Sequence, residues 1–387
     1  MLLGLVGSEM CIRDSHIPSE TFVVTEINAL VNAGHRVTVL TFENLNYCVH
    51  LNKNVQVIVI KKSTPSAVNT LLKNPLMAVK GGVIASRFKS ISAMSLMGYG
   101  LNIAEIIRTK KISHIHCHFM HAPLAYSIIA SKIAGVSVSS IGHGHDVYVN
   151  DDDLKLKLSL CDFSVAVCKD MAVKLSKYSE GKIQLLHCGI DLSLFNNKPS
   201  RLTESVNLIF VGRLIEKKGL QFLLPAIKKI SKKHSITLDI VGDGPLLNDL
   251  KYFCEQLGIT NEVNFLGSKS PQWLAINTSN YSALIAPFCV SKNGDRDTGP
   301  VVLKEAMASG IPVLTTELMG AKEIVNDDVG AKCAPSSITG IEQMLNDFCA
   351  LTPYQRYEKG LNAKRLATKR FNANSQAKKL SHWVQGI

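Results

Sequence analysis

The stretch VNLIFVGRLIEKKGL, residues 206–220, contains an apolar run, a polar loop and the start of a second apolar run. The short run VNLIFV, rich in apolar and β-branched residues and bounded by a glycine, is typical of a buried strand. Gly212 and Arg213 stand where this strand ends, and Lys218 and Gly219 stand where a helical pattern begins. The stretch therefore predicts a strand, a loop that carries cations, and a helix.

The alternation of strand and helix continues on both sides of this stretch. Runs typical of strands lie upstream in RVTVLTF, VQVIVI, ISHIHCHF, VSVSSIG and FSVAVC, and downstream in ITLDIVG, VNFLG, SALIAPF and IPVLTT. Between the halves, NNKPSRLTES has the polar, proline-containing composition of a linker. Because such alternation favours parallel sheets covered on both faces, we expect an α/β protein of two Rossmann-like, doubly wound domains facing a central cleft. Ligands of such sheets bind beyond the carboxyl ends of strands.

These patterns also set the expected boundaries. We expect a first domain over residues 1–195, a linker over 196–204, a second domain over 205–370, and a C-terminal helix over 371–387 that returns to the first domain. Residues 1–15, MLLGLVGSEMCIRDS, resemble a translated sequencing adapter rather than native sequence. Alternatively, LLGLV forms a short buried strand and the Gly-Ser pair after it forms a turn.

Composition limits the classes of partner and compartment. The 387 residues are 46% hydrophobic, which suffices for two separate cores. The net charge of +12 is spread evenly along the chain, so it suits anionic partners such as phosphates or a lipid surface and argues against a nucleic-acid-binding stripe. Ten cysteines without a CxxC pair predict reduced, buried thiols in the cytoplasm. No apolar run reaches the ~18 to 20 residues of a membrane span, so we expect a soluble protein or one peripheral to the inner face of a membrane.

The loop after the 206–211 strand has the chemistry of an anion site. The guanidinium of Arg213 and the amine of Lys218 match phosphate oxygens, and Gly212 allows close approach of the backbone. The pattern fits a clamp for a diphosphate. An ordinary surface loop with two exposed cations has the same sequence, and this alternative stays open.

A histidine-containing loop, HGHDVY, follows the strand VSVSSIG. It places His143, His145 and Asp146 within four positions, and a histidine can donate or accept a hydrogen bond at a reacting centre. The alternative is a histidine that is simply hydrogen-bonded within a turn.

Three further histidines, His114, His116 and His118, alternate along the strand ISHIHCHF and so share one of its faces. Side chains two apart on a strand seldom converge on one ion, and the sequence holds no partner cluster with the spacing of a zinc site. We therefore expect no metal site.

DRDTGPVVLKEAMASGIPVLTT, residues 295–316, sets two carboxylates around a Gly-Pro turn. Gly299 and Pro300 predict a bend followed by the first position of a helix. Asp297 precedes the turn. Glu305 lies on the helix, with its side chain tilted toward the N-terminal end where free backbone N–H groups gather. A carboxylate accepts hydrogen bonds from a diol but repels phosphate, whereas helix N–H groups suit phosphate.

Taken together, several motifs resemble a known family. GRLIEKKG, VGDGP, VNFLG, DRDTGPVVLKEAMASGIPV, HGHD and HCGIDLSLF are similar to motifs of the family-4 retaining glycosyltransferases of GT-B fold. Within that family, the chain resembles the bacterial colanic-acid and other exopolysaccharide glycosyltransferases, which typically begin with PSETF, as at residues 18–22. The resemblance runs from about residue 16 to near the C-terminus and is most specific in the second half.

The resemblance implies an activity and its partners. A sugar would pass from a nucleotide diphosphate sugar to a hydroxyl of a lipid-linked or growing polysaccharide, with retention at the anomeric carbon. The first domain would bind the acceptor and the second the nucleotide sugar. No cofactor or nucleic acid is expected, and no metal is needed because the cations replace one at the diphosphate.

The resemblance also assigns roles to particular residues. Asp297 would contact hydroxyls of the donor sugar, Glu305 the ribose of the nucleotide, and His143 would lie near the donor sugar. The implied donor-binding set is Gly212, Arg213, Lys218, Gly299, Pro300, Val301 and Glu305, and the implied acceptor-side or sugar-side set is Gly144, His145 and Asp146.

The chain departs from the family pattern at one of the two acids. Asp297 stands where a glutamate is usual, and Thr298 with Gly299 stands where a glycine and an apolar residue are usual. An aspartate is one methylene shorter, so Asp295 is a further candidate for the sugar contact.

Other interpretations stay open. A sugar-nucleotide epimerase or a phosphorylase shares the GT-B architecture, and a non-catalytic family member would only hold a nucleotide sugar. In LMAVKGGVIASRFKSISAMSLMGYG, residues 76–100, Lys80, Arg87 and Lys89 stand among apolar residues. This pattern fits a helix that lies on anionic lipid, or a core-facing helix with solvated cations.

Overall fold

The computed structural model divides the chain into two compact units, Met1–Gly189 with Ala373–Ile387, and Ile190–Asn372. It gives the backbone alone for residues 9–13. It describes residues 21–42, 51–61, 75–179, 182–195 and 203–386 in full. The expected strand LLGLV and most of the expected linker over 196–204 lie outside the described residues.

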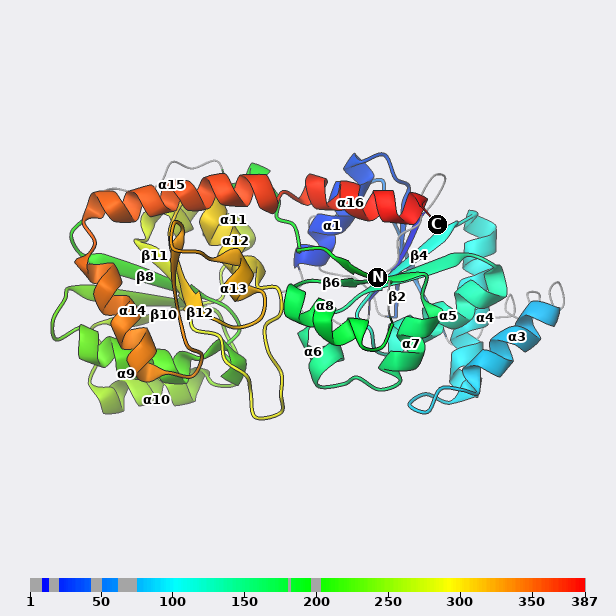
Figure 1. The fold of residues 1–387 in the computed structure, drawn as a ribbon, viewed down its shortest axis with the longest axis horizontal. Coiled ribbons are helices and arrows are strands. Elements are labelled where there is room, and N and C mark those ends of the chain that lie inside the picture. The colour runs from blue at the N-terminus through cyan, green and yellow to red at the C-terminus, as the bar shows by residue number, and fades with distance from the viewer. Residues whose placement is uncertain are drawn as a thin grey trace. The chain divides into compact units, whose positions relative to one another are not determined.

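A seven-stranded parallel sheet forms the centre of the first unit (Figure 1). Its strand order is β3-β2-β1-β4-β5-β6-β7. Glu9 of β1 pairs with Val37 of β2 and with His114 of β4, so residues 9–13 occupy the slot that LLGLV was expected to fill. The strands are β1 (Glu9–Arg13), β2 (Val37–Thr41), β3 (Gln56–Val59), β4 (His114–His118), β5 (Ser137–Ile141), β6 (Phe163–Ala166) and β7 (Ile183–Leu185).

Helices cover both faces of this sheet because the strand order reverses between β1 and β4. The crossover after β1 runs one way along the sheet and the crossover after β4 runs the other way, so α1 and α5 lie on opposite faces (Figure 1). The last helix, α16, packs against α1. The helices of this unit are α1 (Thr21–Asn32), α3 (Pro75–Ala85), α4 (Ala93–Lys110), α5 (Ala122–Ala134), α6 (Gly144–Tyr148), α7 (Leu154–Leu160), α8 (Lys169–Ser176) and α16 (Ala373–Gln385).

The second unit contains a six-stranded parallel sheet of order β10-β9-β8-β11-β12-β13. Its strand order reverses between β8 and β11, so the loops after these two strands adjoin at the carboxyl edge of the sheet. The strands are β8 (Val206–Val211), β9 (Ile236–Val241), β10 (Val263–Gly267), β11 (Ala283–Ala286), β12 (Val313–Thr316) and β13 (Gly330–Cys333).

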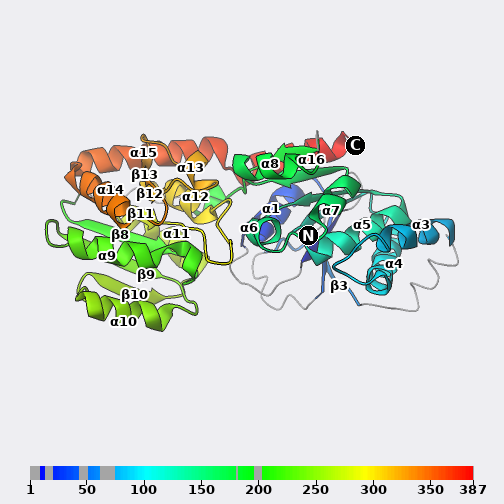
Figure 2. The ribbon, with the colours of Figure 1, turned by 60° about the horizontal axis from the view of Figure 1, so that its bottom comes forward.

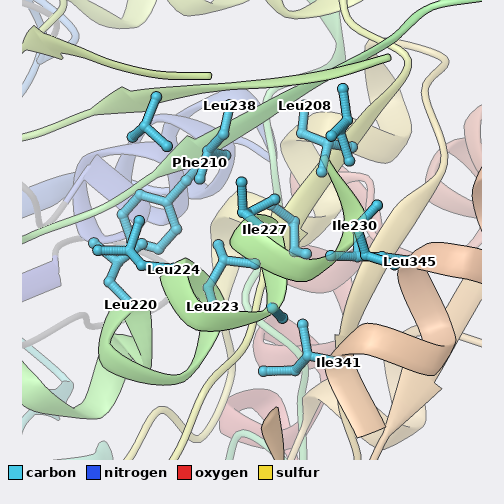
Figure 3. Close-up of a cluster of buried hydrophobic side chains, with 14 of the residues drawn as sticks. Leu208, Phe210, Leu220, Leu223, Leu224, Ile227, Ile230, Leu238, Ile341 and Leu345 are labelled. Carbon is cyan, nitrogen blue, oxygen red and sulfur yellow. The ribbon is translucent and has the colours of Figure 1, made fainter. Parts of the chain in front are cut away.

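The side chains of β8 alternate between two cores, as the period of a strand requires. Leu208 and Phe210 belong to a buried cluster that also contains Ile227 of α9 and Ile341 of α14 (Figure 3). Ile209 joins a second cluster on the other face. In both views α9 and α10 lie on the opposite side of the sheet from α15 (Figure 1 and Figure 2). The helices are α9 (Leu220–Ile230), α10 (Leu247–Leu257), α11 (Pro271–Asn277), α12 (Val301–Ala308), α13 (Ala321–Ile324), α14 (Ile338–Ala350) and α15 (Pro353–Arg370), with short 3-10 turns η1 (Leu192–Leu194), η2 (Glu216–Lys218) and η3 (Thr278–Asn280).

The α/β architecture with two parallel, Rossmann-like sheets is confirmed. The chain passes between the units at 189/190 and at 372/373, rather than at the expected 195 and 370. In the described part of the chain, no helix is long and apolar enough to cross a membrane. Eight cysteines there carry free thiols, and they are Cys117, Cys161, Cys168, Cys188, Cys254, Cys289, Cys333 and Cys349.

Candidate active site

Two loops of the second unit are held together by close backbone contacts. Gly219 ends the loop after β8 with φ 76°, and a Cβ atom there would lie 1.8 Å from the carbonyl oxygen of Pro287 in the loop after β11. Only glycine fits this position. Nearby, the N–H of Cys289 donates to the carbonyl of Lys217 at 2.9 Å. The two loops at the switch point are therefore fixed against each other.

Two neighbouring ion pairs join the same loops. Nζ of Lys217 lies 3.0 Å from Oδ2 of Asp295, and Nζ of Lys218 lies 3.2 Å from Oδ2 of Asp297. The four side chains are only 14–18% exposed. The Lys218 amine also lies 5.0 Å from the centroid of the Phe288 ring, within range of a cation–π attraction. The predicted phosphate ligand Lys218 and the predicted sugar ligand Asp297 are thus in contact, and Asp295 is held by a different lysine.

Arg213 differs from the two lysines. Its side chain is exposed, and it forms no ion pair or hydrogen bond with any residue that the structure describes. The next residue, Leu214, is fully buried, and its N–H donates to the carbonyl of Asp243 at 2.8 Å. Leu214 therefore anchors the loop, and the guanidinium of Arg213 remains available to an anionic ligand.

Helix α12 begins directly after the predicted Gly-Pro turn. Pro300 has φ −60°, which suits the entry to a helix. The carbonyl of Thr298 accepts the N–H of Gly320 at 3.1 Å, and a Cβ atom at Gly320 would lie 2.3 Å from that oxygen. This contact fixes the position of Gly299. The first N–H groups of α12, from Val301 onward, have no acceptor within the helix and can bind an anion.

Glu305 lies in the second turn of α12. Burial raises the pKa of its carboxyl group to about 7, although the neighbouring charge of Lys304 opposes the shift. Lys304 is itself fully buried, with its amine 5.2 Å from the centroid of the Phe371 ring. Glu305 therefore exchanges its proton near neutral pH, where a ligand that prefers the ionised form can draw it into the carboxylate state.

In the first unit, Asp146 connects the loops that follow β4 and β5. Its Oδ1 accepts the N–H of His143 at 2.8 Å, and its Oδ2 accepts the N–H of Met120 at 2.5 Å. The side chain is fully buried, and burial raises its pKa to about 7. Both oxygens thus bind the backbone, so Asp146 positions the backbone of His143, and its expected place on the sugar side stays a prediction. His145 is exposed and Gly144 is half-buried.

The imidazole of His143 lies among other rings. The ring centroids of Phe22, Phe119 and His118 are 5.0, 4.6 and 5.6 Å away, and the His118 ring is nearly parallel to it at 14°. Burial lowers the pKa of His143 well below its usual value, and the neighbouring His118 lowers it further, so the ring is neutral. Phe119 has φ 74°, a region that residues with side chains rarely adopt and that is concentrated at functional sites.

One acid near this loop was missed by the sequence analysis. Oε1 of Glu26, on α1, lies 2.9 Å from Nε2 of His118 and 3.8 Å from Nε2 of His116. Both histidines are buried on one face of β4, and burial lowers the pKa of His116 well below its usual value while it raises that of Glu26. His116 and His118 both approach the Glu26 carboxylate, because α1 supplies a third side chain that the strand pattern alone does not include. Glu26 is the one charged residue of the apolar helix TFVVTEINALVN. A single acid in an otherwise uncharged helix could have marked it as a functional candidate.

The predicted site residues thus form two groups. The structure brings Gly212, Lys218, Asp297, Gly299, Pro300 and the start of α12 together in the second unit, with Arg213 on the same loop. It brings His143, Gly144, His145 and Asp146 together in the first unit.

Comparisons with known proteins identify the family. Residues 19–194 match the family described as Glycosyltransferase Family 4, and residues 195–360 match the family described as Glycosyl transferases group 1. The fold and the site define a glycosyltransferase of GT-B type. The chain belongs to the glycosyltransferases that join these two domains, and it is related to enzymes of exopolysaccharide biosynthesis.

Two relatives and two solved structures illustrate the likeness. The putative colanic acid biosynthesis glycosyltransferase WcaL of Escherichia coli K12 is 23% identical over 347 residues, 83% of this chain and 85% of that protein. The amylovoran biosynthesis glycosyltransferase AmsK of Erwinia amylovora is 29% identical over 156 residues, 40% and 38% of the two chains. A glycosyltransferase of Rickettsia africae has a TM-score of 0.74 at 18% identity, covering 97% of both chains. HepE of Anabaena, in complex with UDP and glucose, has a TM-score of 0.73 at 17% identity, covering 98% and 99%.

Proposed function

We propose that this protein transfers a sugar from a nucleotide diphosphate sugar to a hydroxyl of a lipid-linked or growing saccharide, with retention at the anomeric carbon. The observation that carries the proposal lies at the switch point of the second sheet. There Lys218 pairs with an acid, Asp297, four residues before the start of α12 at Val301, and Arg213 lies on the same loop as Lys218. Cations and backbone N–H groups suit the diphosphate, and carboxylates suit the hydroxyl groups of a sugar or ribose.

The ion pair between Lys218 and Asp297 suggests how the donor enters. Nζ of Lys218 and Oδ2 of Asp297 lie 3.2 Å apart, so each charge neutralises the other. An incoming diphosphate would take over Lys218, and a sugar hydroxyl would then donate to Asp297. The site is in this way arranged in advance for a ligand that carries both groups, with little rearrangement of either loop.

Departure of the diphosphate is the step that these cations assist. Negative charge grows on the leaving phosphate as the bond to the anomeric carbon lengthens, and Arg213 and Lys218 stabilise it. We propose that the two cations make a metal ion at the diphosphate unnecessary. Glu305 would bind the ribose in its ionised form, because a diol donates hydrogen bonds to a carboxylate.

His143 would act as a neutral hydrogen-bonding group near the donor sugar. Its lowered pKa excludes a standing positive charge, and Nε2 is buried without a hydrogen-bond partner among the described residues. A buried polar atom without a partner is costly, and a sugar hydroxyl would satisfy it. The relatives support this choice of substrate, because HepE binds UDP and glucose and WcaL and AmsK are named for polysaccharide biosynthesis.

A donor panel tests the proposal. UDP-, GDP- and ADP-sugars are added to the purified chain, and thermal stability and slow donor hydrolysis are measured. One donor should raise the melting temperature in proportion to its occupancy. Arg213→Ala should lower turnover by about 10²- to 10³-fold. Arg365→Ala, which removes an exposed arginine on α15, is the matched control. Unchanged binding and turnover in Arg213→Ala would remove this clamp from the mechanism.

The acceptor side of the proposal includes a membrane surface. On α3, Ala78, Gly81 and Ala85 face the core, while Leu76, Val79 and Val83 are 78%, 64% and 62% exposed. The cations Lys80, Arg87 and Lys89 are exposed on and just beyond this helix. We propose that this outward apolar stripe rests on anionic lipid, where a lipid-linked acceptor resides.

Vesicle co-sedimentation tests this part separately from catalysis. Binding to vesicles of phosphatidylglycerol should exceed binding to vesicles of phosphatidylcholine, and it should fall with added salt. The double variant Val79→Ser, Val83→Ser should lose most of this binding while it keeps the stabilisation by the sugar nucleotide. Equal sedimentation of wild type and variant would contradict the role of the stripe.

A further inference from the structure

A second cluster of chemically active side chains lies in the first unit, and the transfer reaction proposed above does not require it. Glu26, His116 and His118 each offer one ligand atom, and these atoms lie within 4.8 Å of one another. Two come from one face of β4, and the third is Glu26 of α1, which reaches both histidines on that face. We propose that these three side chains bind a divalent transition-metal ion of the zinc class.

The separations of the ligand atoms suit such an ion. A tetrahedral Zn²⁺ with ligands at about 2.0–2.1 Å places neighbouring ligand atoms about 3.3 Å apart. The Glu26–His118 separation of 2.9 Å and the Glu26–His116 separation of 3.8 Å lie on either side of this value. All three ligand atoms lie within 4.8 Å of one another, and side-chain rotation would bring each pair to the separation that the ion requires. Two histidines and one carboxylate are also a common ligand set of zinc sites that keep a fourth position for water.

Hydrogen bonding around His116 favours a metal ligand at its outer nitrogen. Nδ1 of His116 lies 2.8 Å from Oγ of Ser139, which in turn lies 2.7 Å from Nε2 of His114. Nε2 of His116 is buried, and it has no hydrogen-bond partner among the described residues. When Nδ1–H donates to Ser139, Nε2 presents a lone pair toward Glu26. Metal-binding histidines are typically oriented in this way, by a hydrogen bond from the other ring nitrogen.

His114 shows why the site has two histidines and not three. Although it shares the face of β4, both of its ring nitrogens lie within 2.7 Å of serine hydroxyls, Ser137 at Nδ1 and Ser139 at Nε2. It is therefore a support of the site, and the ion would be held by His116, His118 and Glu26 alone.

The ion would also position the ring of His143. The imidazole of His118 stacks on that of His143 at 5.6 Å and 14°. A metal bond at Nε2 of His118 would fix its ring plane more firmly than one hydrogen bond to a carboxylate, and the stacked ring would be fixed with it. The inference does not depend on the proposed transfer reaction, because metal binding can be measured without any substrate.

Metal binding by the full chain is the decisive measurement. The protein is prepared without a polyhistidine tag, stripped with a chelator, and titrated with Zn²⁺ against a chromophoric competitor. We expect one equivalent to bind, and Zn²⁺ to raise the melting temperature. Co²⁺ should give the intense visible absorption of a tetrahedral site. Fe²⁺ under anaerobic conditions is the comparison, because two histidines and a carboxylate also suit that ion.

Two single variants separate a metal site from a hydrogen-bonded cluster. Glu26→Gln keeps an oxygen that can accept from His118 but loses the charged ligand, so we expect zinc affinity to fall by at least about 10- to 100-fold. His382→Gln removes an exposed histidine of α16 and should leave affinity unchanged. The proposal is overturned if the wild type binds no ion more tightly than the competitor does, or if Glu26→Gln binds zinc as the wild type does. The first outcome is measured on the wild type, so it tests the proposal even if Glu26→Gln fails to fold.

Discussion

The two units share one architecture and differ in the chemistry at the same topological place. Each is a parallel sheet whose strand order reverses at its centre. In the second unit, the loops at this reversal carry charged pairs, Lys217 with Asp295 and Lys218 with Asp297. In the first unit, the corresponding region holds rings, in which the neutral His143 lies against Phe22 and other aromatic side chains.

The difference shows how a repeated fold is divided between two tasks. Charged pairs that remain partly exposed can exchange partners with an anionic ligand at small cost, because water and the loops already stabilise them. A buried neutral ring cannot offer charge, but it holds a fixed direction for a hydrogen bond. Under the proposed function, strand topology would fix where ligands bind, and the loop residues would fix which part of a ligand each unit accepts.

The largest effect is expected from removing a charge in the second unit. Lys218→Ala should lower turnover of the donor by about 10²- to 10³-fold, since the growing charge on the diphosphate would lose one of the two cations proposed to stabilise it. Steady-state kinetics with the donor identified above measure the loss. Lys233→Ala, at an exposed position after α9, is the control and should change little. A normal rate in Lys218→Ala would mean that Lys218 does not stabilise the charge on the departing diphosphate.

Glycine at position 219 tests whether the charged loops depend on close backbone packing. Gly219→Ala adds a Cβ at φ 76° and 1.8 Å from the Pro287 oxygen, so the free energy of unfolding should fall by roughly 3 kcal/mol. Urea denaturation measures this change. Gly82→Ala is the matched control because it lies within α3 with no atom within 4 Å of the added Cβ, and it should gain about 0.5–1 kcal/mol. Equal stability of the two variants would contradict the packing argument.

In the first unit, one buried acid is expected to act through the backbone. Asp146→Asn keeps one acceptor oxygen but turns an amide N–H₂ toward the second backbone N–H, so it should lower the free energy of unfolding by about 1–3 kcal/mol. Asp328→Asn, at an exposed loop position, should stay within about 0.5 kcal/mol of wild type. Should Asp146→Asn lose activity at full stability instead, Asp146 would contact substrate as the resemblance suggested.

The smallest effect is a pH dependence of donor affinity. Glu305 has a pKa raised to about 7, so below that pH the free protein carries a protonated carboxyl group. If the ribose binds the ionised form, the dissociation constant should rise by up to about tenfold for each pH unit below 7 and level off above it. Glu305→Gln should bind more weakly at high pH and lose this dependence, as calorimetry between about pH 5.5 and 8 would show. If Glu305→Gln kept the pH dependence of the wild-type dissociation constant, the titrating group would be on the nucleotide and not on Glu305.

The contribution of Glu305 to folding stability should change with pH in the opposite direction to its contribution to donor affinity. Because the folded pKa of Glu305 lies above the unfolded value near 4.5, the protonated form favours the folded state. Its contribution is complete below about pH 4.5 and is lost as pH rises through about 7. Glu305→Gln should therefore gain stability relative to wild type at pH 8, by up to about 1.4 kcal/mol for each unit between the two pKa values.

The sequence predicted most of the fold because its signals are local. The run VNLIFV and the glycine after it mark a strand end without knowledge of any distant residue, and Gly299 with Pro300 marks the start of α12. The confirmed glycosyltransferase family rests on such short motifs. The roles assigned to Arg213, Asp297 and Glu305 remain predictions.

What the sequence could not predict depends on contacts between distant segments. Glu26 and His118 are 92 positions apart, and only the packing of α1 on β4 brings them within 2.9 Å. The pairing of Lys218 with Asp297 likewise needs the register of β8 against β11. The burial of Asp146 and its bonds to the backbone N–H groups of Met120 and His143 also cannot be read from HGHD.

The packing of α16 on α1 has a consequence for the order in which the chain can fold during synthesis. The apolar side chains of α1, such as Val23 and Ile27, are synthesised before the second unit, and α16, the helix that packs against α1, is synthesised after it. The whole of Ile190–Asn372 emerges between them and can complete its core first. Translation that stops before residue 373 would thus release a folded second unit joined to a first unit whose α1 exposes apolar side chains. Chaperones and proteases are expected to recognise such a product.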